Sequence, residues 1–108
     1  MTFDEALASR LRRLLPSAVE KRMFGGIGLL ERGNLVAGIS HQDLIVRVAA
    51  DETERWLKRP GVHPMMMRRP MKGWVKVSAS AVRGDRRLSE WVRRSREIAR
   101  ALPPKKGH

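Results

Sequence analysis

The sequence predicts an α+β fold, a two-layer sandwich in which helices cover an antiparallel sheet. Two observations lead to this prediction. Apolar residues recur with a period of about 3.6 near both ends of the chain and with a period of about 2 between them. Short groups of turn-forming residues separate the alternating segments, which is typical of hairpins. The expected order is a helix, a meander of about four strands, a helix, one or more strands and a final helix.

The first helix is expected to begin at the amino terminus. Thr2 and Glu5 have the spacing of a capping box, in which a hydroxyl and a carboxylate each accept a backbone N–H. The apolar residues that follow form one stripe of a helix, namely Leu7, Leu11, Leu14 and Leu15. Pro16 is expected to end this helix.

The region from Val19 to Val48 has the alternation of strands. One strand face is expected to hold Leu35, Ala37 and Ile39, and another Leu44, Val46 and Val48. Turn formers at 32–34 and 40–43 separate these segments, so we expect an antiparallel meander.

The second half begins with a short helix from Asp51, whose buried residues would be Trp56 and Leu57. A loop containing Pro64 and three consecutive methionines is expected next, followed by a strand at 73–78. A cap at 84–85 starts the final helix, with the apolar stripe Leu88, Trp91, Val92, Ile98, Ala99 and Leu102. Residues 1–102 are therefore expected to form one domain, and 103–108 a flexible basic tail.

Positive charge is the strongest feature of the composition. The chain of 108 residues has 23 Lys and Arg against 11 Asp and Glu, a net charge of +12, and no acid lies between Glu54 and Asp85. This asymmetry favours an acidic partner, and nucleic acid is the first candidate. The predicted patch consists of Arg68, Arg69, Lys72 and Lys76. The alternative is an arginine-rich surface without a partner.

The composition also excludes several classes of protein. Cys is absent, which excludes disulfides and thiolate metal sites and fits a reducing cytosol. No apolar run approaches the roughly 18 residues that span a bilayer, and the N-terminus has no secretory signal. We therefore expect a cytoplasmic protein with no membrane partner.

The glycines at positions 25, 26 and 28 resemble a phosphate-binding turn at first sight. Such a turn must lead into the N-terminus of a helix, whereas the residues after Gly28 have the pattern of a strand. The G-x-G-x-x-G spacing and the Walker lysine are also absent. The glycines are better interpreted as a tight turn or bulge between two strands.

The same segment carries a resemblance to a known family. Arg22, Met23, Phe24, Gly25 and Gly26, the hairpin at 33–39, the strand at 43–48, and the segments 69–75 and 102–105 resemble the TfoX N-terminal domain family. The resemblance implies a two-layer α+β domain of secretion-chaperone-like shape, without established catalytic residues. The family takes its name from regulators of natural competence, in which a helical domain follows. The competence role is not expected of the N-terminal domain alone.

Histidines and methionines supply the remaining candidate site residues. His41, His63 and His108 lie in a turn, a loop and the tail, so they have no metal-ligand spacing, and we expect neither a metal nor a cofactor. Four methionines, Met65, Met66, Met67 and Met71, either fill gaps beneath a loop or line a groove for an apolar partner or small molecule.

These observations favour a non-enzymatic binding or regulatory module of the TfoX N-terminal type. Such a module would act on a protein partner and could form a homodimer. The first alternative is a basic protein that binds DNA or RNA non-specifically. The second is a small-ligand or hydrolytic activity in the groove beside the methionines.

Overall fold

The α+β fold predicted from the sequence is confirmed. The computed structural model describes residues 4–23, 25–66 and 68–105. Its elements are α1 (Glu5–Leu14), β1 (Val19–Met23), β2 (Gly26–Glu31), β3 (Asn34–Ser40), β4 (Asp43–Arg47), η1 (Ala50–Glu52), α2 (Thr53–Leu57), β5 (Val62–Met66), β6 (Pro70–Val77), η2 (Ala79–Val82) and α3 (Asp85–Arg100). The labels η1 and η2 denote 3₁₀ turns.

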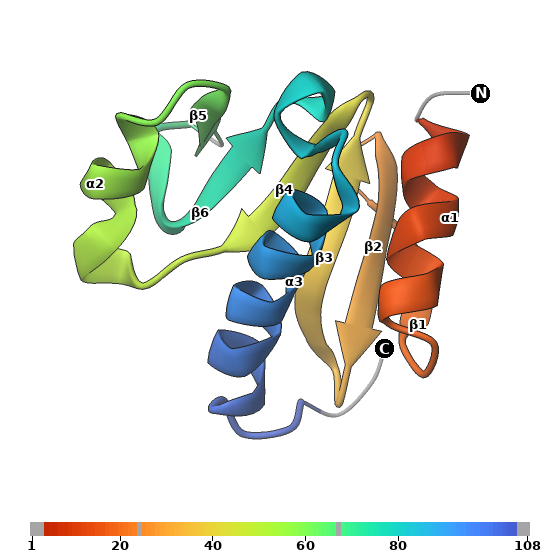
Figure 1. Cartoon of the computed structure of the whole chain (residues 1–108). Helices are drawn as coiled ribbons and strands as arrows, with labels where there is room; N and C mark the ends of the chain where they lie inside the picture. Colours follow the sequence, from red (N-terminus) through yellow and green to blue (C-terminus); the bar gives the residue numbers. More distant parts are fainter. Residues whose placement is uncertain (1–3, 24, 67, 106–108) are drawn as a thin grey trace.

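All the described strands belong to one antiparallel sheet with the order β1-β2-β3-β4-β6-β5. The first four strands form the predicted meander, and β6 then inserts between β4 and the edge strand β5. Helices α1 and α3 lie side by side on one face of this sheet, and α2 packs beside β5 and β6 (Figure 1). No helix of the described residues is long and apolar enough to cross a membrane.

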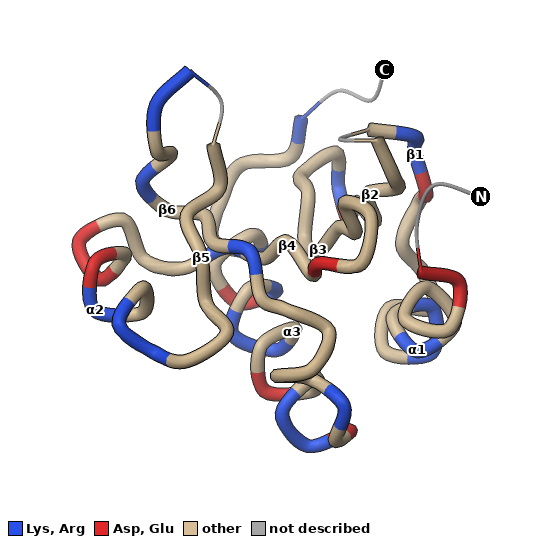
Figure 2. The backbone as a smooth tube through the Cα atoms, turned by 90° about the horizontal axis from the view of Figure 1, so that it is seen from above, with Lys and Arg blue, Asp and Glu red and all other residues tan. Residues whose placement is uncertain are grey.

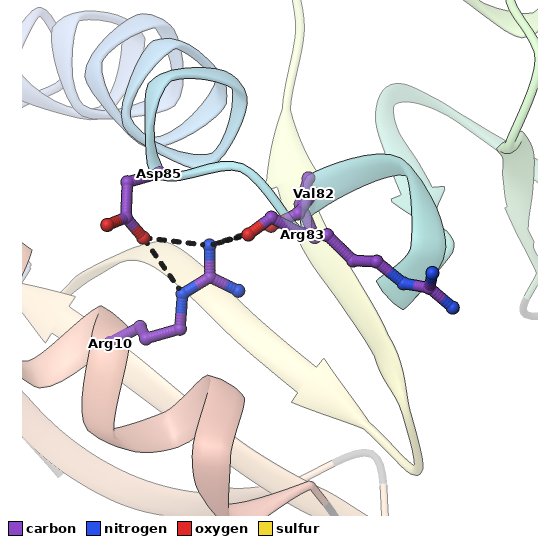
Figure 3. Close-up of polar contacts among 4 residues, drawn as sticks. All are labelled: Arg10, Val82, Arg83 and Asp85. Carbon is purple, nitrogen blue, oxygen red and sulfur yellow. Dashed lines mark hydrogen bonds and ion pairs between the residues drawn. The ribbon is translucent and has the colours of Figure 1, made fainter.

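The helix α1 begins one residue after its cap, Asp4, whose carboxylate accepts a hydrogen bond from the backbone N–H of Leu7 at 3.0 Å. The predicted cap Thr2 lies outside the described residues. Leu7 and Leu11 are buried, as their helical spacing predicts, and they pack against the sheet. On the other side of α1, Arg10 reaches the start of α3, where it contacts Val82, Arg83 and Asp85 (Figure 3).

A bulge changes the faces predicted for β3. The pairing between β2 and β3 shifts between Leu29 and Leu30, so that Leu30 lies opposite Leu35 while Leu29 lies opposite Ala37. The extra residue, Val36, is fully buried in the core, whereas Leu35 is half-buried and approaches Gly28 on the opposite face. The prediction that Leu35 shares a face with Ala37 is therefore wrong, because one inserted residue reverses the alternation.

The predicted methionine loop is also wrong in part, since Val62–Met66 forms the strand β5. Val62 and Met65 are buried, and β5 pairs with β6 in an irregular register. Pro64 is compatible with this strand because β5 lies at the edge of the sheet, where a missing N–H does not break a ladder. Met67 lies outside the described residues.

The carboxyl-terminal segment folds back onto the turn between β2 and β3. The backbone N–H of Lys105 donates to the carbonyl of Arg32 at 2.8 Å, and the Asn34 side-chain amide donates to the carbonyl of Pro103 at 3.0 Å. A Cβ at Gly33 would clash with the carbonyl oxygen of Lys105. Glycine at this position therefore allows the close approach of the two segments.

Candidate functional site

The turn at Arg22–Gly26 connects β1 and β2. Gly25 has φ of +72°, a conformation that favours glycine, and β2 begins at Gly26 with no helix after it. This geometry lacks the helix N-terminus on which a phosphate loop depends. Arg22 is exposed, Met23 packs over Gly28, and Phe24 lies outside the described residues.

The four basic residues of the predicted patch all lie on the β5–β6 hairpin. Arg68 and Arg69 are exposed in its turn, Lys72 is exposed on β6, and Lys76 is half-buried further along the same strand. Lys72 and Lys76 are four residues apart, which corresponds to about 13 Å along a strand. The positive charge therefore extends along the hairpin (Figure 2).

A pocket of about 560 Å³ lies between this hairpin and α2. We call it the hairpin pocket. Its lining residues come from η1, α2, β5 and β6, and they are Ala50, Asp51, Thr53, Glu54, Leu57, Pro64, Pro70, Met71, Lys72 and Trp74. Of the four methionines that the sequence suggested for a groove, Met71 lines the pocket, Met65 is buried and Met66 is exposed on β5. The pocket thus combines an apolar wall, including one tryptophan, with a few charged groups at its edge.

Hydrogen bonds hold the backbone of the hairpin pocket in place. The buried hydroxyl of Thr53 donates to the carbonyl of Ala50 at 2.9 Å and accepts from the N–H of Gly73 at 2.8 Å. Gly73 has φ of +88°, and its carbonyl accepts from the N–H of Val48 at 3.0 Å. These contacts fix β6 beside α2, so hydrogen bonds of the fold itself hold the two walls of the pocket in place.

Arg47 supports the indole ring of Trp74 in the pocket wall. Its Cζ lies 4.3 Å from the ring centroid, and its Nε donates to the carbonyl of Leu35 at 2.7 Å. Burial lowers the pKa of the Arg47 guanidinium from its usual value. Arg47 therefore serves as a structural support for the ring through cation–π attraction.

The charged groups at the edge of the hairpin pocket are exposed and have no ion-pair partner among the described residues. Asp51 and Glu54 carry two carboxylates, and Lys72 carries one ammonium. Five other acids, Glu5, Glu20, Glu31, Glu52 and Asp85, make ion pairs with arginines elsewhere in the described chain. The pocket edge is thus locally acidic on a protein whose net charge is +12.

A second group of contacting side chains lies where α2 and the turn after it meet α3. The Cζ atoms of Arg59 and Arg94 lie 4.5 Å and 4.3 Å from the ring centroid of Trp56, and that of Arg55 lies at 5.4 Å. We call these four residues the tryptophan–arginine cluster. The indole of Trp91 packs edge-on against that of Trp56, with the ring centroids 5.2 Å apart. Both rings are buried in the core, beneath the three arginines. Arg55 and Arg59 belong to the acid-free stretch of the sequence, whereas Arg94 lies outside it.

The histidines do not form a metal site in the described chain. No three His, Asp or Glu residues of that part lie close enough together to hold a metal ion. His41 is exposed in the β3–β4 turn, and Nε2 of His63 lies 3.0 Å from Oγ of Ser78. His108 lies outside the described residues.

Comparison with known proteins identifies the family of the chain. The model of the TfoX N-terminal domain family matches residues 10–99. The chain belongs to the TfoX N-terminal domain family. No curated protein and no solved structure matches it.

The match of the TfoX N-terminal domain family includes the hairpin pocket and the tryptophan–arginine cluster in full. The segment from Arg69 to Val75, on which the resemblance was partly based, supplies Pro70, Met71, Lys72 and Trp74 to the pocket wall. Part of the resemblance to the family therefore rests on residues that line the pocket.

Proposed function

We propose that this protein is a non-enzymatic binding and regulatory module that takes its ligand in the hairpin pocket. The observation that supports this function most directly is the composition of the pocket wall. It offers Trp74, Met71 and Leu57 as apolar contacts around a volume of about 560 Å³. Pockets of this size and character are typical of sites for small organic groups.

The polar groups of the pocket are suited to binding rather than to catalysis. A hydroxyl nucleophile needs a free O–H beside a base. The Thr53 hydroxyl is buried and already engaged with the backbone at Ala49, Ala50 and Gly73. Asp51, Glu54 and Lys72 are exposed to water at the pocket edge, where they can attract a charged ligand.

The charge of the pocket edge favours a ligand that joins an apolar body to a positive charge. Two carboxylates stand against one ammonium among the lining residues. Arg47 covers one face of the Trp74 indole, and the other face can attract a cation. Such a ligand is an organic amine or a basic side chain of a protein partner. The rest of the surface, with its large positive charge, would repel it.

The test uses two probes with the same indole body and opposite charges, tryptamine and indole-3-acetate. In a protein labelled with ¹⁵N, tryptamine should shift the indole N–H signal of Trp74 in a saturable manner, with a Kd of about 1 mM. Trp74→Phe assigns that signal, and Asp51→Asn with Glu54→Gln should weaken binding about tenfold. Indole-3-acetate binding more tightly than tryptamine, or neither probe shifting the signal, would overturn the proposal.

A second candidate function is non-specific binding of DNA or RNA. The observation in its favour is the number of arginines without an acidic partner among the described residues, including Arg59, Arg68, Arg69 and Arg94. Phosphate contacts by such residues give affinity without sequence preference. The cytoplasmic location and the homodimer expected from the sequence stay predictions.

A further inference from the structure

We propose that the tryptophan–arginine cluster is the surface through which this protein binds the phosphate backbone of a nucleic acid. The inference rests on the second candidate function and assigns it to α2 and α3, away from the hairpin arginines that the sequence suggested. It is independent of ligand binding in the hairpin pocket.

The ring of Trp56 positions the guanidinium groups of Arg59 and Arg94 without using their N–H donors. Attraction to an aromatic face uses the charge of a guanidinium, and its five N–H groups can still donate to another acceptor. The Cζ atoms of Arg59 and Arg94 lie 4.5 Å and 4.3 Å from the centroid of Trp56. Trp56 is itself only 7% exposed and packs on Trp91, so it is a rigid support for both side chains.

The side chains of these two arginines contact only aromatic rings in the described chain, and Arg94 also lies over Trp91, with its Cζ 5.3 Å from that ring centroid. Neither guanidinium makes an ion pair or donates a hydrogen bond to another described residue, whereas those of Arg10, Arg12 and Arg96 do both. Arg55 differs, because its guanidinium forms an ion pair with the carboxylate of Glu52, with an N–O distance of 3.1 Å. Arg59 and Arg94 are therefore the members of the cluster with donors available for phosphate oxygens.

The dimensions of the cluster fit a nucleic acid strand. The two larger distances to the Trp56 centroid limit the separation of any two of its guanidinium carbons to about 10 Å. Phosphates follow one another every 3.4 Å along the axis of one strand, so the cluster spans at most about three of them. Lys58, which directly follows α2, and Arg87 on α3 are exposed and add further positive charge. Figure 2 shows Lys and Arg on both helices.

The surroundings favour a nucleic acid over a protein or a membrane. Protein interfaces and membrane-binding surfaces need exposed apolar side chains at their centre. The large apolar residues exposed in the described chain are Val19 on β1 and Met66 on β5, and neither lies on α2 or α3. A contact at the cluster is therefore electrostatic, as contacts to a phosphate backbone are.

The experiment measures binding of a fluorescein-labelled 20-base-pair duplex DNA by polarisation between about 50 and 200 mM salt. The variant Arg59→Gln with Arg94→Gln removes two phosphate contacts, so the slope of log K against log salt should fall by about 1.8. Affinity at 50 mM salt should fall about a hundredfold. The matched control, Arg68→Gln with Arg69→Gln, removes the same charge from the hairpin and should retain most of the affinity.

A second double variant separates the effect of charge on DNA affinity from the effect of the guanidinium shape. Arg59→Lys with Arg94→Lys keeps both charges, so the slope should stay unchanged while affinity falls about tenfold through loss of bidentate contacts. Thermal unfolding and the tryptamine titration confirm that each variant is folded and that its hairpin pocket is intact. If the protein binds tryptamine normally but does not bind DNA, this inference is wrong, and the function proposed for the hairpin pocket is unaffected.

Four outcomes would overturn the inference. They are no binding of the duplex at 50 mM salt, equal losses in the cluster and hairpin variants, a larger loss in the hairpin variant, and unchanged affinity in the Arg59→Gln/Arg94→Gln variant. Vesicles of phosphatidylglycerol provide the comparison for a membrane. Binding to vesicles that requires Arg59 and Arg94, in a protein that does not bind the duplex, would identify an anionic lipid surface as the partner.

Discussion

Arg10 on α1 and Asp85 at the start of α3, 75 residues apart in the sequence, are joined by an ion pair of 3.1 Å (Figure 3). The same guanidinium also donates to the carbonyls of Val82 at 2.7 Å and Arg83 at 3.1 Å. The side chain of Asp85 is 94% exposed, while that of Arg10 is only 24% exposed. Arg10 thus fastens one helix to the beginning of the other mainly through backbone carbonyls.

Replacement of Arg10 should cost more stability than replacement of its acidic partner. Arg10→Ala removes charge-assisted hydrogen bonds to two carbonyls and should lower the free energy of unfolding by about 2 kcal/mol. Asp85→Asn removes only an exposed ion pair and should cost less than about 1 kcal/mol. Urea unfolding of the two variants measures both values. Equal losses would show that the ion pair, and not the carbonyl contacts, holds the helices together.

Ser95 should be the most sensitive serine of α3. Its buried hydroxyl donates to the carbonyl of Val36 and accepts from the N–H of Arg47 at 2.8 Å. Ser95→Ala removes this partner from the carbonyl of Val36 at the bulge of β3 and from the N–H of Arg47 on β4, so it should cost about 2 kcal/mol. Ser89→Ala, at an exposed position of the same helix, is the matched control and should change stability by less than about 0.5 kcal/mol.

The pair Trp56 and Trp91 should show energetic coupling. Trp91 is 6% exposed, and Trp91→Ala should cost about 3–5 kcal/mol because it leaves a cavity between α3 and the sheet. The edge-on contact at 5.2 Å predicts a coupling energy of about 1 kcal/mol in a double-mutant cycle with Trp56→Ala. Additive losses in chemical denaturation would contradict the contact.

Gly25 should be required for its backbone conformation alone. A Cβ at this position meets nothing nearer than the His41 ring at 3.8 Å, while φ is +72°. Gly25→Ala should therefore cost about 1 kcal/mol, and Gly25→Asn clearly less, because Asn tolerates this conformation. Neither variant should change the affinity for tryptamine or duplex DNA. An unchanged melting temperature for Gly25→Ala would contradict the left-handed turn.

Periodicity alone identified most of the core. Leu7 and Leu11 on α1 and Trp91 on α3 were found because an amphipathic helix repeats its buried face every 3.6 residues. The reversal at Val36 could not be found in this way, because a bulge depends on which residue of the neighbouring strand it faces. The sequence did not indicate β5, because Pro64 is unusual in a strand and the methionines favour none. Proline is tolerated here because β5 lies at the edge of the sheet.

The candidate sites were predictable only in part. Met71 and Lys72 lie in the segment that the sequence singled out, and they line the hairpin pocket. Thr53 and Glu54 come from a helix more than a dozen residues earlier, and only the pairing of β6 with β4 and β5 brings them together. Arg94 reaches Trp56 because two aromatic rings meet in the core, a contact that no local pattern encodes.

The order of the strands has a consequence for the rate at which the chain folds. Strands β1 to β4 pair with their neighbours in sequence, and short loops close quickly, so the meander can form early. The contact of Arg10 with Asp85 closes a loop of 75 residues and is expected to form after the rate-limiting step. Weakening this contact should therefore accelerate unfolding while leaving the refolding rate nearly unchanged.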